Sequence, residues 1–224
     1  MLFILLEYIP AVNLFKANSL KEKLVTNFIA SGPIPFPQYF LLPRKIRGIF
    51  FIPLGFIGLK GNDAQEFADK NFFPNSTMDG LPLEEFDAMS WEEIEELIQG
   101  GQLIGGHTNN HPKLNEVSEY ELDNEVISSA EYIESKLKIE IKQFAYPFGT
   151  IDAVNQEAIS SCKKKYNVAF SNIRGMLKEN NNKFFLFRQN LVPGTPEWLV
   201  SAIIEGKLDW LHRKKRFLAK NFSV

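Results

Sequence analysis

The stretch of this chain whose residue types point most directly to chemistry contains two histidines. His107 and His111 are two of the three histidines, and they follow an apolar pair, Leu103–Ile104, and two glycines, Gly105–Gly106. Neutral imidazole is a common ligand of zinc and its neighbours in the first transition row, and a spacing of four places both rings on one side of a helical turn. We therefore interpret them as candidate metal ligands. The alternative is a polar loop whose histidines bond to the backbone or cap a helix.

The segments that must position these histidines alternate between strand and helix patterns. Ser90 and Glu93 have capping-box spacing before a helix that runs to Gly100–Gly101, and Ser118 with Glu121 repeats this spacing before an amphipathic helix. A further short helix is expected over residues 18–28. The expected strands cover residues 2–8, 48–53, 103–104, 144–149, 167–170 and 184–191. Alternation of this kind predicts an α/β fold with a largely parallel sheet, in which reactive groups collect at the carboxyl ends of strands.

Length and composition fit one ordinary globular domain. The chain has 224 residues, of which 45% are hydrophobic and 23% charged, so we expect a single domain over residues 1–224. Residues 60–88 are polar and broken, which predicts an excursion over the surface. Neither a phosphate-cradling glycine loop nor a Gly-x-Ser-x-Gly elbow is present, which argues against a nucleotide-binding P-loop and an α/β-hydrolase site.

Charge and hydropathy argue against nucleic acid and membrane-spanning roles. The net charge is −2, and no apolar run approaches the ~20 residues that span a bilayer. The apolar N-terminal stretch lacks a basic start and contains Glu7 and Pro10, so we interpret it as a buried strand and expect a cytoplasmic protein. Cys162 is the only cysteine, which excludes an internal disulfide. The basic run His212–Arg216 is typical of a solvated helix end, with an anionic partner as the alternative.

Residues 46–192 resemble the polysaccharide deacetylases, whose shared part is the chitooligosaccharide deacetylase homology domain. Residues 89–94 and 105–114 are similar to the family's second motif and the helix before it, and residues 144–149 to the third. Residues 47–52 resemble the strand after the first motif, and residues 186–188 a late strand that brings an arginine to the site. The resemblance implies a distorted (β/α)7 barrel with largely parallel strands and one divalent metal, often zinc.

The resemblance also implies roles for individual residues. His107 and His111 would bind the metal, which would polarise an acetyl carbonyl and lower the pKa of a bound water. An aspartate of the first motif would take the proton of that water. The backbone N–H of Phe148 would help to hold the developing oxyanion. Arg188 would orient the catalytic carboxylate, because Ala145 stands where many members place an arginine.

The first motif departs from the family pattern, because its paired aspartates are missing. The usual spacing places Asn27 at the position of the base and Phe28 at that of the metal ligand, and neither side chain has the required chemistry. A second alignment uses the end of the first strand and treats residues 9–45 as an enlarged connection. Glu7 then stands in the base position and Tyr8 in the ligand position. A glutamate is competent as base or ligand, so Glu7 is our candidate.

Two functions follow from the resemblance. The first is a divergent metal-dependent hydrolase that removes an N-acetyl or O-acetyl group from a carbohydrate, as in surface polysaccharide metabolism. The second is a catalytically inactive relative that binds glycan and lacks the paired aspartates. The general-acid histidine that many members carry late in the chain is unplaced, since His212 is the only histidine left.

Overall fold

One parallel sheet organises the chain. The computed structural model describes residues 3–6, 26–27, 47–74, 82–175, 182–190, 196–219 and 222. Within these residues the sheet has seven strands in the order β6-β5-β4-β3-β1-β2-β7, and every paired neighbour is parallel. The strands are β1 (Phe3–Leu6), β2 (Thr26–Asn27), β3 (Arg47–Ile52), β4 (Leu103–Gly106), β5 (Gln143–Ala145), β6 (Val168–Phe170) and β7 (Gln189–Asn190).

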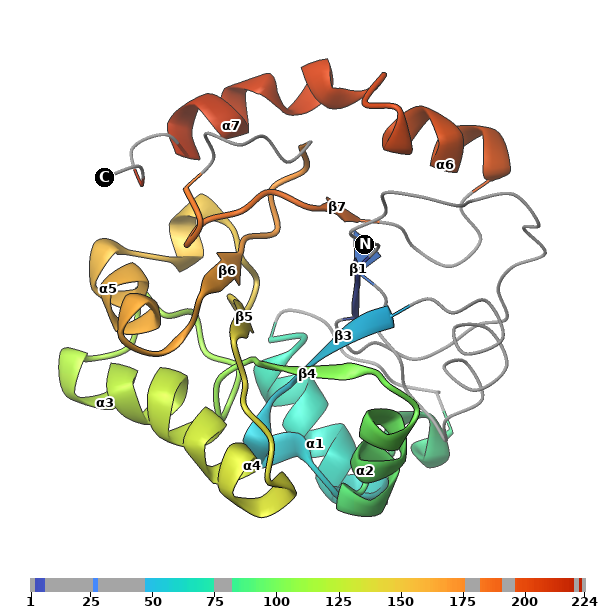
Figure 1. The fold of residues 1–224 in the computed structure, drawn as a ribbon, viewed down its shortest axis with the longest axis vertical. Helices are drawn as coiled ribbons and strands as arrows, with labels where there is room; N and C mark the ends of the chain where they lie inside the picture. Colours follow the sequence, from blue (N-terminus) through green and yellow to red (C-terminus); the bar gives the residue numbers. More distant parts are fainter. Residues whose placement is uncertain are drawn as a thin grey trace.

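The sheet curves towards closure without a continuous ladder between its edges. β7 pairs with β2 at one edge, and Leu186, just before β7, forms an isolated parallel bridge to Phe170 of β6 at the other edge. The segment from Leu186 to β7 therefore contacts both ends of the sheet (Figure 1). This arrangement is a distorted barrel and confirms the predicted fold class. Of the expected strand 184–191, only the short β7 and this bridge are regular, and residue 191 lies outside the described residues.

Helices lie around the outside of the strands in Figure 1. The α-helices are α1 (Gly61–Asn71), α2 (Trp91–Gln99), α3 (Glu119–Asp123), α4 (Ser129–Leu137), α5 (Gln156–Lys165), α6 (Glu197–Ile204) and α7 (Arg213–Ala219). Short 3-10 turns are η2 (Leu54–Phe56), η3 (Leu83–Phe86), η5 (Ile151–Ala153) and η6 (Asp209–His212). A π-helical turn, η4 (Asn124–Ser128), joins α3 to α4. No helix among the described residues is long and apolar enough to cross a membrane.

Helix capping agrees with the prediction from the sequence at α2 and differs from it at α3. The capping box of Ser90 and Glu93 is present, and α2 ends at Gly100 with Gly101 in the left-handed region. Ser118 also precedes a helix, but its hydroxyl donates to the Glu121 carboxylate at 2.6 Å and caps no backbone N–H. The second predicted capping box is therefore wrong, because the two side chains satisfy each other.

Two further expectations need correction. Thr26–Asn27 is strand β2, inside the expected helix 18–28, whose other residues lie outside the described set. Residues 61–71 form the helix α1 within the segment 60–88 that was expected to be broken. The small side chains of α1 allow this, because Ala64 and Ala68 pack into an apolar cluster with Phe56 and Phe86.

Strand β3 is buried on both faces. Phe50 and Ile52 belong to the large cluster between sheet and helices, whereas Ile49 and Phe51 belong to a smaller cluster on the opposite face. The residue types of β4 follow from this packing. A Cβ at Gly105 would lie 2.4 Å from the Phe51 ring.

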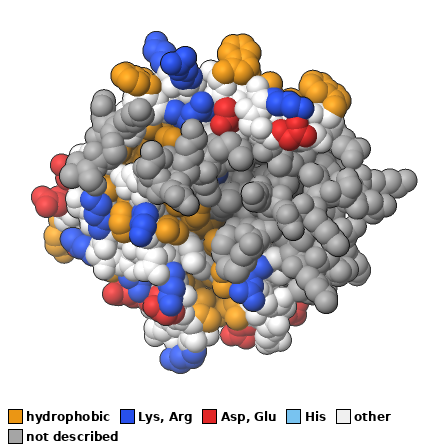
Figure 2. Space-filling model, turned by 45° about the horizontal axis from the view of Figure 1, so that its top comes forward, with side chains coloured by type: hydrophobic (Ala, Val, Ile, Leu, Met, Phe, Trp, Pro, Cys, Tyr) orange, Lys and Arg blue, Asp and Glu red, His pale blue; other side chains and the backbone are white. Residues whose placement is uncertain are grey.

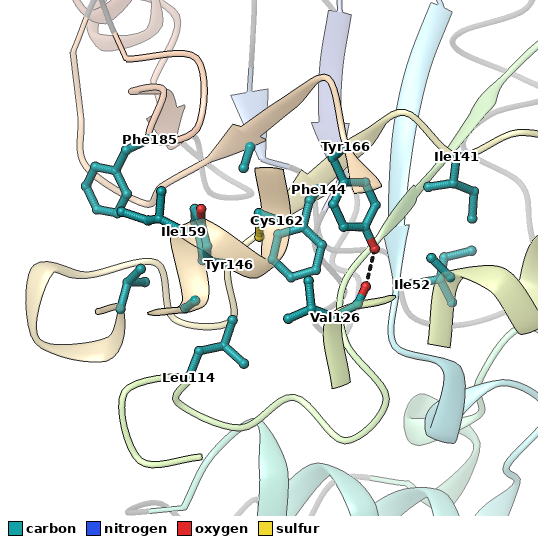
Figure 3. Packing of buried hydrophobic residues seen from close by; sticks show 14 of the residues in the cluster. Ile52, Leu114, Val126, Ile141, Phe144, Tyr146, Ile159, Cys162, Tyr166 and Phe185 are labelled. Carbon is teal, nitrogen blue, oxygen red and sulfur yellow. Dashed lines mark hydrogen bonds between the residues drawn. The ribbon is translucent and has the colours of Figure 1, made fainter. Parts of the chain in front are cut away.

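The second glycine of β4, Gly106, leaves room for the side chain of Tyr166. A Cβ at Gly106 would lie 2.4 Å from the hydroxyl of Tyr166, which donates a hydrogen bond to the carbonyl of Val126 in the π-helical turn (Figure 3). Tyr166 is buried beside Phe144, with ring centroids 4.9 Å apart. The pair of glycines before the histidines therefore serves packing: it lets Phe51 and Tyr166 approach the strand.

Removal of this buried hydroxyl should destabilise the fold. We expect Tyr166→Phe to lower the free energy of unfolding by about 1–3 kcal/mol, because the Val126 carbonyl would lose its partner away from water. Tyr120→Phe is the matched control, since the Tyr120 side chain is 86% exposed. Urea denaturation of both variants tests this, and equal midpoints would contradict it.

Candidate active site

The two histidine rings lie side by side at the carboxyl end of β4. Their centroids are 4.8 Å apart, and the His107 ring is buried. His107 Nδ1 lies 2.7 Å from the carbonyl oxygen of Ala145, and His111 Nδ1 lies 3.0 Å from that of Asn71. A carbonyl oxygen only accepts, so each Nδ1 carries a proton, and a ring that is neutral then has its lone pair on Nε2. Backbone carbonyls commonly hold metal-binding histidines in this tautomer.

Burial keeps His107 neutral. It lowers the pKa of His107 from 6.5 to about 3, with a smaller contribution from the Arg188 charge, while the hydrogen bond to Ala145 acts in the opposite direction. The lone pair is therefore present throughout the physiological range, and a metal ligand needs this form.

The histidine loop is not the helical turn that the spacing of four suggested. Thr108 and His111 both have left-handed backbone conformations, with φ of 68° and 59°. The Thr108 hydroxyl donates to the carbonyl of His107 and accepts from the backbone N–H of His111 at 2.9 Å. Left-handed residues other than glycine cost about 1–3 kcal/mol each and persist only where the surroundings impose them. The loop is thus a shaped element that needs support.

Glu125 supplies that support from the π-helical turn. Its Oε2 accepts from the backbone N–H groups of Asn109 and Asn110, both at 2.9 Å, and its Oε1 accepts from the side-chain amide of Asn110 at 2.8 Å. One carboxylate therefore holds two of the three residues between the histidines. Hydrogen bonds to a charged acceptor are stronger than those between neutral groups.

The other side of the loop is held by the backbone after β3. Leu54 N–H donates to the Thr108 carbonyl at 3.1 Å, and Gly55 N–H donates to the Asn109 carbonyl at 2.9 Å. A Cβ at Gly55 would lie 2.9 Å from the Asn109 oxygen, so only glycine allows this approach. The loop lies between η2 and η4 and is bonded to both.

The π-helical turn itself is stabilised by side chains. Such turns leave carbonyls without ordinary helical partners and occur frequently at functional sites. Here the Ser129 hydroxyl donates to the Glu125 carbonyl at 2.6 Å, and the Tyr166 hydroxyl donates to the Val126 carbonyl. Both bonds fix the part of the helix from which the Glu125 side chain reaches the loop.

The turn after β5 lies beside the histidines. Phe148 has a φ of 56°, and its ring centroid is 4.9 Å from that of His111. The next residue, Gly149, is also left-handed, and its carbonyl accepts from the Asn172 N–H at 2.8 Å. A Cβ at Gly149 would lie 2.5 Å from that same nitrogen. Three of the four left-handed non-glycine residues described, Thr108, His111 and Phe148, thus belong to this site.

Arg188 is buried near the site. Its backbone N–H donates to the Ile173 carbonyl at 3.0 Å, and its side chain is close enough for its charge to lower the pKa of His107. Glu7 lies outside the described residues. Within the described part of the chain, no group of three or more metal-binding side chains is present. The structure therefore brings together His107, His111, Phe148 and Arg188, while their roles stay predictions.

Sequence reasoning missed the residues that hold the histidines. Glu125 looks like one more polar residue on an amphipathic helix, and Asn71 acts through its carbonyl, which carries no sequence signal. His212, the remaining histidine, lies at the end of η6. Partial burial lowers its pKa, and the neighbouring charges of Arg174 and Lys215 act in the same direction.

Comparisons with known proteins agree with this fold. The family model for polysaccharide deacetylase matches residues 61–167, just under half of the chain. No curated protein sequence matches the chain. The structure is similar to that of Streptococcus pyogenes deacetylase PplD in complex with acetate, with a TM-score of 0.58 and 19% identity over 80% of this chain and 69% of that one.

Two other solved structures show the same fold. IcaB from Ammonifex degensii has a TM-score of 0.58 and 17% identity, over 90% of this chain and 95% of that one. A polysaccharide deacetylase from Bacillus cereus has a TM-score of 0.54 and 18% identity over 80% of this chain, which spans 50% of that protein.

The fold and the site define a class: a distorted parallel barrel with a histidine pair after a central strand. The matched residues include both histidines, Glu125 and Phe148. Residues 61–167 match the family model for polysaccharide deacetylase, in agreement with the resemblance that the sequence motifs carry.

The neutral state of His107 predicts a pH dependence of stability. Its folded pKa of about 3 lies below its ordinary value of 6.5, so the unfolded chain binds the proton first as the pH falls. With a chelator present, we therefore expect His107 to lower the free energy of unfolding as the pH falls from about 6 to about 4. The expected decrease is up to about 1.4 kcal/mol per pH unit. Urea unfolding of wild type and His107→Gln measures this contribution. Equal slopes against pH in the two proteins would contradict it.

Loss of the Glu125 carboxylate should loosen the histidine loop without unfolding the barrel. In Glu125→Ala we expect the amides of Asn109 and Asn110 to exchange with deuterium about tenfold faster or more, because each loses a charge-assisted hydrogen bond. Glu131→Ala, in the exposed part of α4, is the control. Unchanged protection of the two amides would show that other contacts hold the loop.

Proposed function

We propose that the protein is a metal-dependent deacetylase that hydrolyses an N-acetyl or O-acetyl group on a carbohydrate. The observation that carries this proposal is the adjacent pair of histidine rings, each with Nδ1 bonded to a backbone carbonyl. The family match and the deacetylase folds support a carbohydrate deacetylase. By analogy with the family, we assign the substrate to surface polysaccharide metabolism.

The two imidazoles fit a divalent metal such as zinc and would supply two of its ligands. Neutral imidazoles of fixed tautomer suit zinc, and catalytic zinc commonly has three protein ligands. When bound, such an ion supplies Lewis-acid polarisation of the acetyl carbonyl and makes water more acidic. His107 and His111 would hold it.

We assign the missing carboxylate to Glu7, which follows β1. β1 lies directly beside β3, with Leu6 opposite Phe50, and Phe50 is opposite Ile104 of β4. The alternative position, Asn27 in β2, is one strand further from the histidine loop, and an amide cannot accept the proton. This strand order supports the alignment that uses Glu7 as base or third ligand.

The remaining roles belong to groups around the histidines. Glu7 would take a proton from the attacking water. The backbone N–H of Phe148, in the left-handed turn beside His111, would donate to the oxyanion that forms from the acetyl carbonyl. The buried guanidinium of Arg188 would orient the carboxylate.

A catalytically inactive, glycan-binding relative is the second candidate. One observation favours it: the described residues contain no third metal-binding side chain near the two histidines. In that case the site would bind glycan whether or not a metal is present.

Metal retention separates the two candidates. We expect close to one zinc, cobalt, nickel or manganese ion per chain after dialysis, and loss of this ion in His107→Ala and in His111→Ala. His212→Ala is the matched control, since it removes the remaining histidine, which lies in η6. Metal content by mass spectrometry that is the same in wild type and in the double variant would contradict the proposal.

Acetate release tests the chemistry. We expect wild type to release acetate from N-acetylated oligosaccharides, and Glu7→Gln to reduce the rate at least about a hundredfold while metal is retained. An unchanged rate would remove Glu7 from the mechanism. Glycan affinity that survives a chelator, without acetate release, would favour the inactive relative.

A further inference from the structure

The C-terminal helices present large apolar side chains outward. In α6, Trp198 is 70% exposed, and in η6 and α7, Trp210 is 70%, Leu211 55%, Phe217 68% and Leu218 42% exposed. Figure 2 shows hydrophobic and basic side chains, with some acidic ones, along the upper rim of the molecule. A large exposed apolar set of this kind marks an interaction site.

The spacing along η6 and α7 sorts these residues into stripes. Trp210, Lys214 and Phe217 are separated by four and three residues and so share one face of the helix. Leu211, Lys215 and Leu218 repeat the same spacing one residue later. Both stripes have a lysine between two apolar side chains, and the apolar members and lysines are exposed.

A third stripe, which contains Arg216 and Ala219, faces the protein. It is the least apolar of the three. Arg216 donates from Nη1 to the carbonyl of Arg174 at 3.1 Å, and its Cδ lies 2.7 Å from where a Cβ of Gly175 would be. Ala219, three residues on, is buried. This is the reverse of a surface helix that packs its apolar side inward. The protein's own core therefore does not explain the apolar residues of α7.

The outward face is positively charged. Arg213, Lys214 and Lys215 are all exposed. The nearby acidic groups do not lie among them: the Asp209 carboxylate accepts from the Gln189 side chain at 3.1 Å, and Glu205 forms an ion pair with Lys207. A partner of this face must accept apolar side chains and carry negative charge.

We propose that α6, η6 and α7 dock the protein on the surface of a membrane that contains anionic lipids. Trp and Phe side chains favour the boundary between headgroups and acyl chains, and leucines add apolar burial. Lysines placed between them can lay their stems along the apolar surface and reach the lipid phosphates. An acidic glycan or nucleic acid would account for the cations but not for Leu211 and Leu218. This inference is independent of the proposed deacetylase activity.

Co-sedimentation of the full chain with vesicles tests the proposal. We expect binding to vesicles of equimolar phosphatidylcholine and phosphatidylglycerol, weak binding to phosphatidylcholine alone, and loss of binding as salt increases. Lys214→Glu with Lys215→Glu should weaken binding by about tenfold or more. Lys70→Glu with Lys163→Glu makes the same change of charge at exposed sites elsewhere and should leave binding unchanged.

The apolar contribution is tested separately. Trp210→Ser with Phe217→Ser should weaken binding by at least about tenfold, whereas Tyr120→Ser with Tyr132→Ser, also exposed, should not. Circular dichroism and thermal unfolding check that each variant is folded. Equal affinity for both vesicle types, no binding by wild type, or equal loss in the control variants would overturn the proposal. So would a wild-type dimer that Trp210→Ser with Phe217→Ser converts to a monomer without any vesicle binding, because the face would then join two copies.

Discussion

The geometry of the candidate site depends on one carboxylate. Glu125 accepts hydrogen bonds from Asn109 and Asn110, two of the three residues between the histidines, while the backbone after β3 holds the opposite side of the loop. The loop needs both supports, because Thr108 and His111 are held in left-handed conformations that unsupported chains avoid. These supports act together with the Thr108 hydrogen bonds inside the loop, and the two ring centroids lie 4.8 Å apart.

The position of Glu125 depends in turn on a π-helical turn and on a glycine. The extra residue of the turn shifts the helix register at Asn124–Ser128, and hydroxyls from Ser129 and Tyr166 bond to the carbonyls of this turn. Tyr166 can approach β4 only because residue 106 has no side chain. The strand that leads into the histidine loop and the helix that holds it are thus coupled through a buried aromatic side chain (Figure 3).

The sequence predicted the architecture better than the site. The apolar run of β3, the Ser90 capping box and the alternation of elements are local signals, and local physics decides them. The histidine loop was expected as a helical turn, because spacing alone cannot reveal left-handed residues imposed by tertiary contacts. Glu125 gave no signal, since its role arises from contact with residues 15 and 16 positions earlier in the chain. Thr26–Asn27 became a strand because pairing with β1 and β7 overrode a weak helical pattern.

The central claim is that the fold prepares both imidazoles as ligands before any metal arrives. Long-range proton–nitrogen NMR of the metal-free protein near neutral pH tests this most directly, because it reports which nitrogen of each ring carries the proton. The hydrogen bonds to Ala145 and Asn71 predict that Nδ1 carries a proton in both rings, and the burial of His107 predicts that this ring is neutral. A proton on Nε2 in either ring, or rapid exchange between the two forms, would contradict the account.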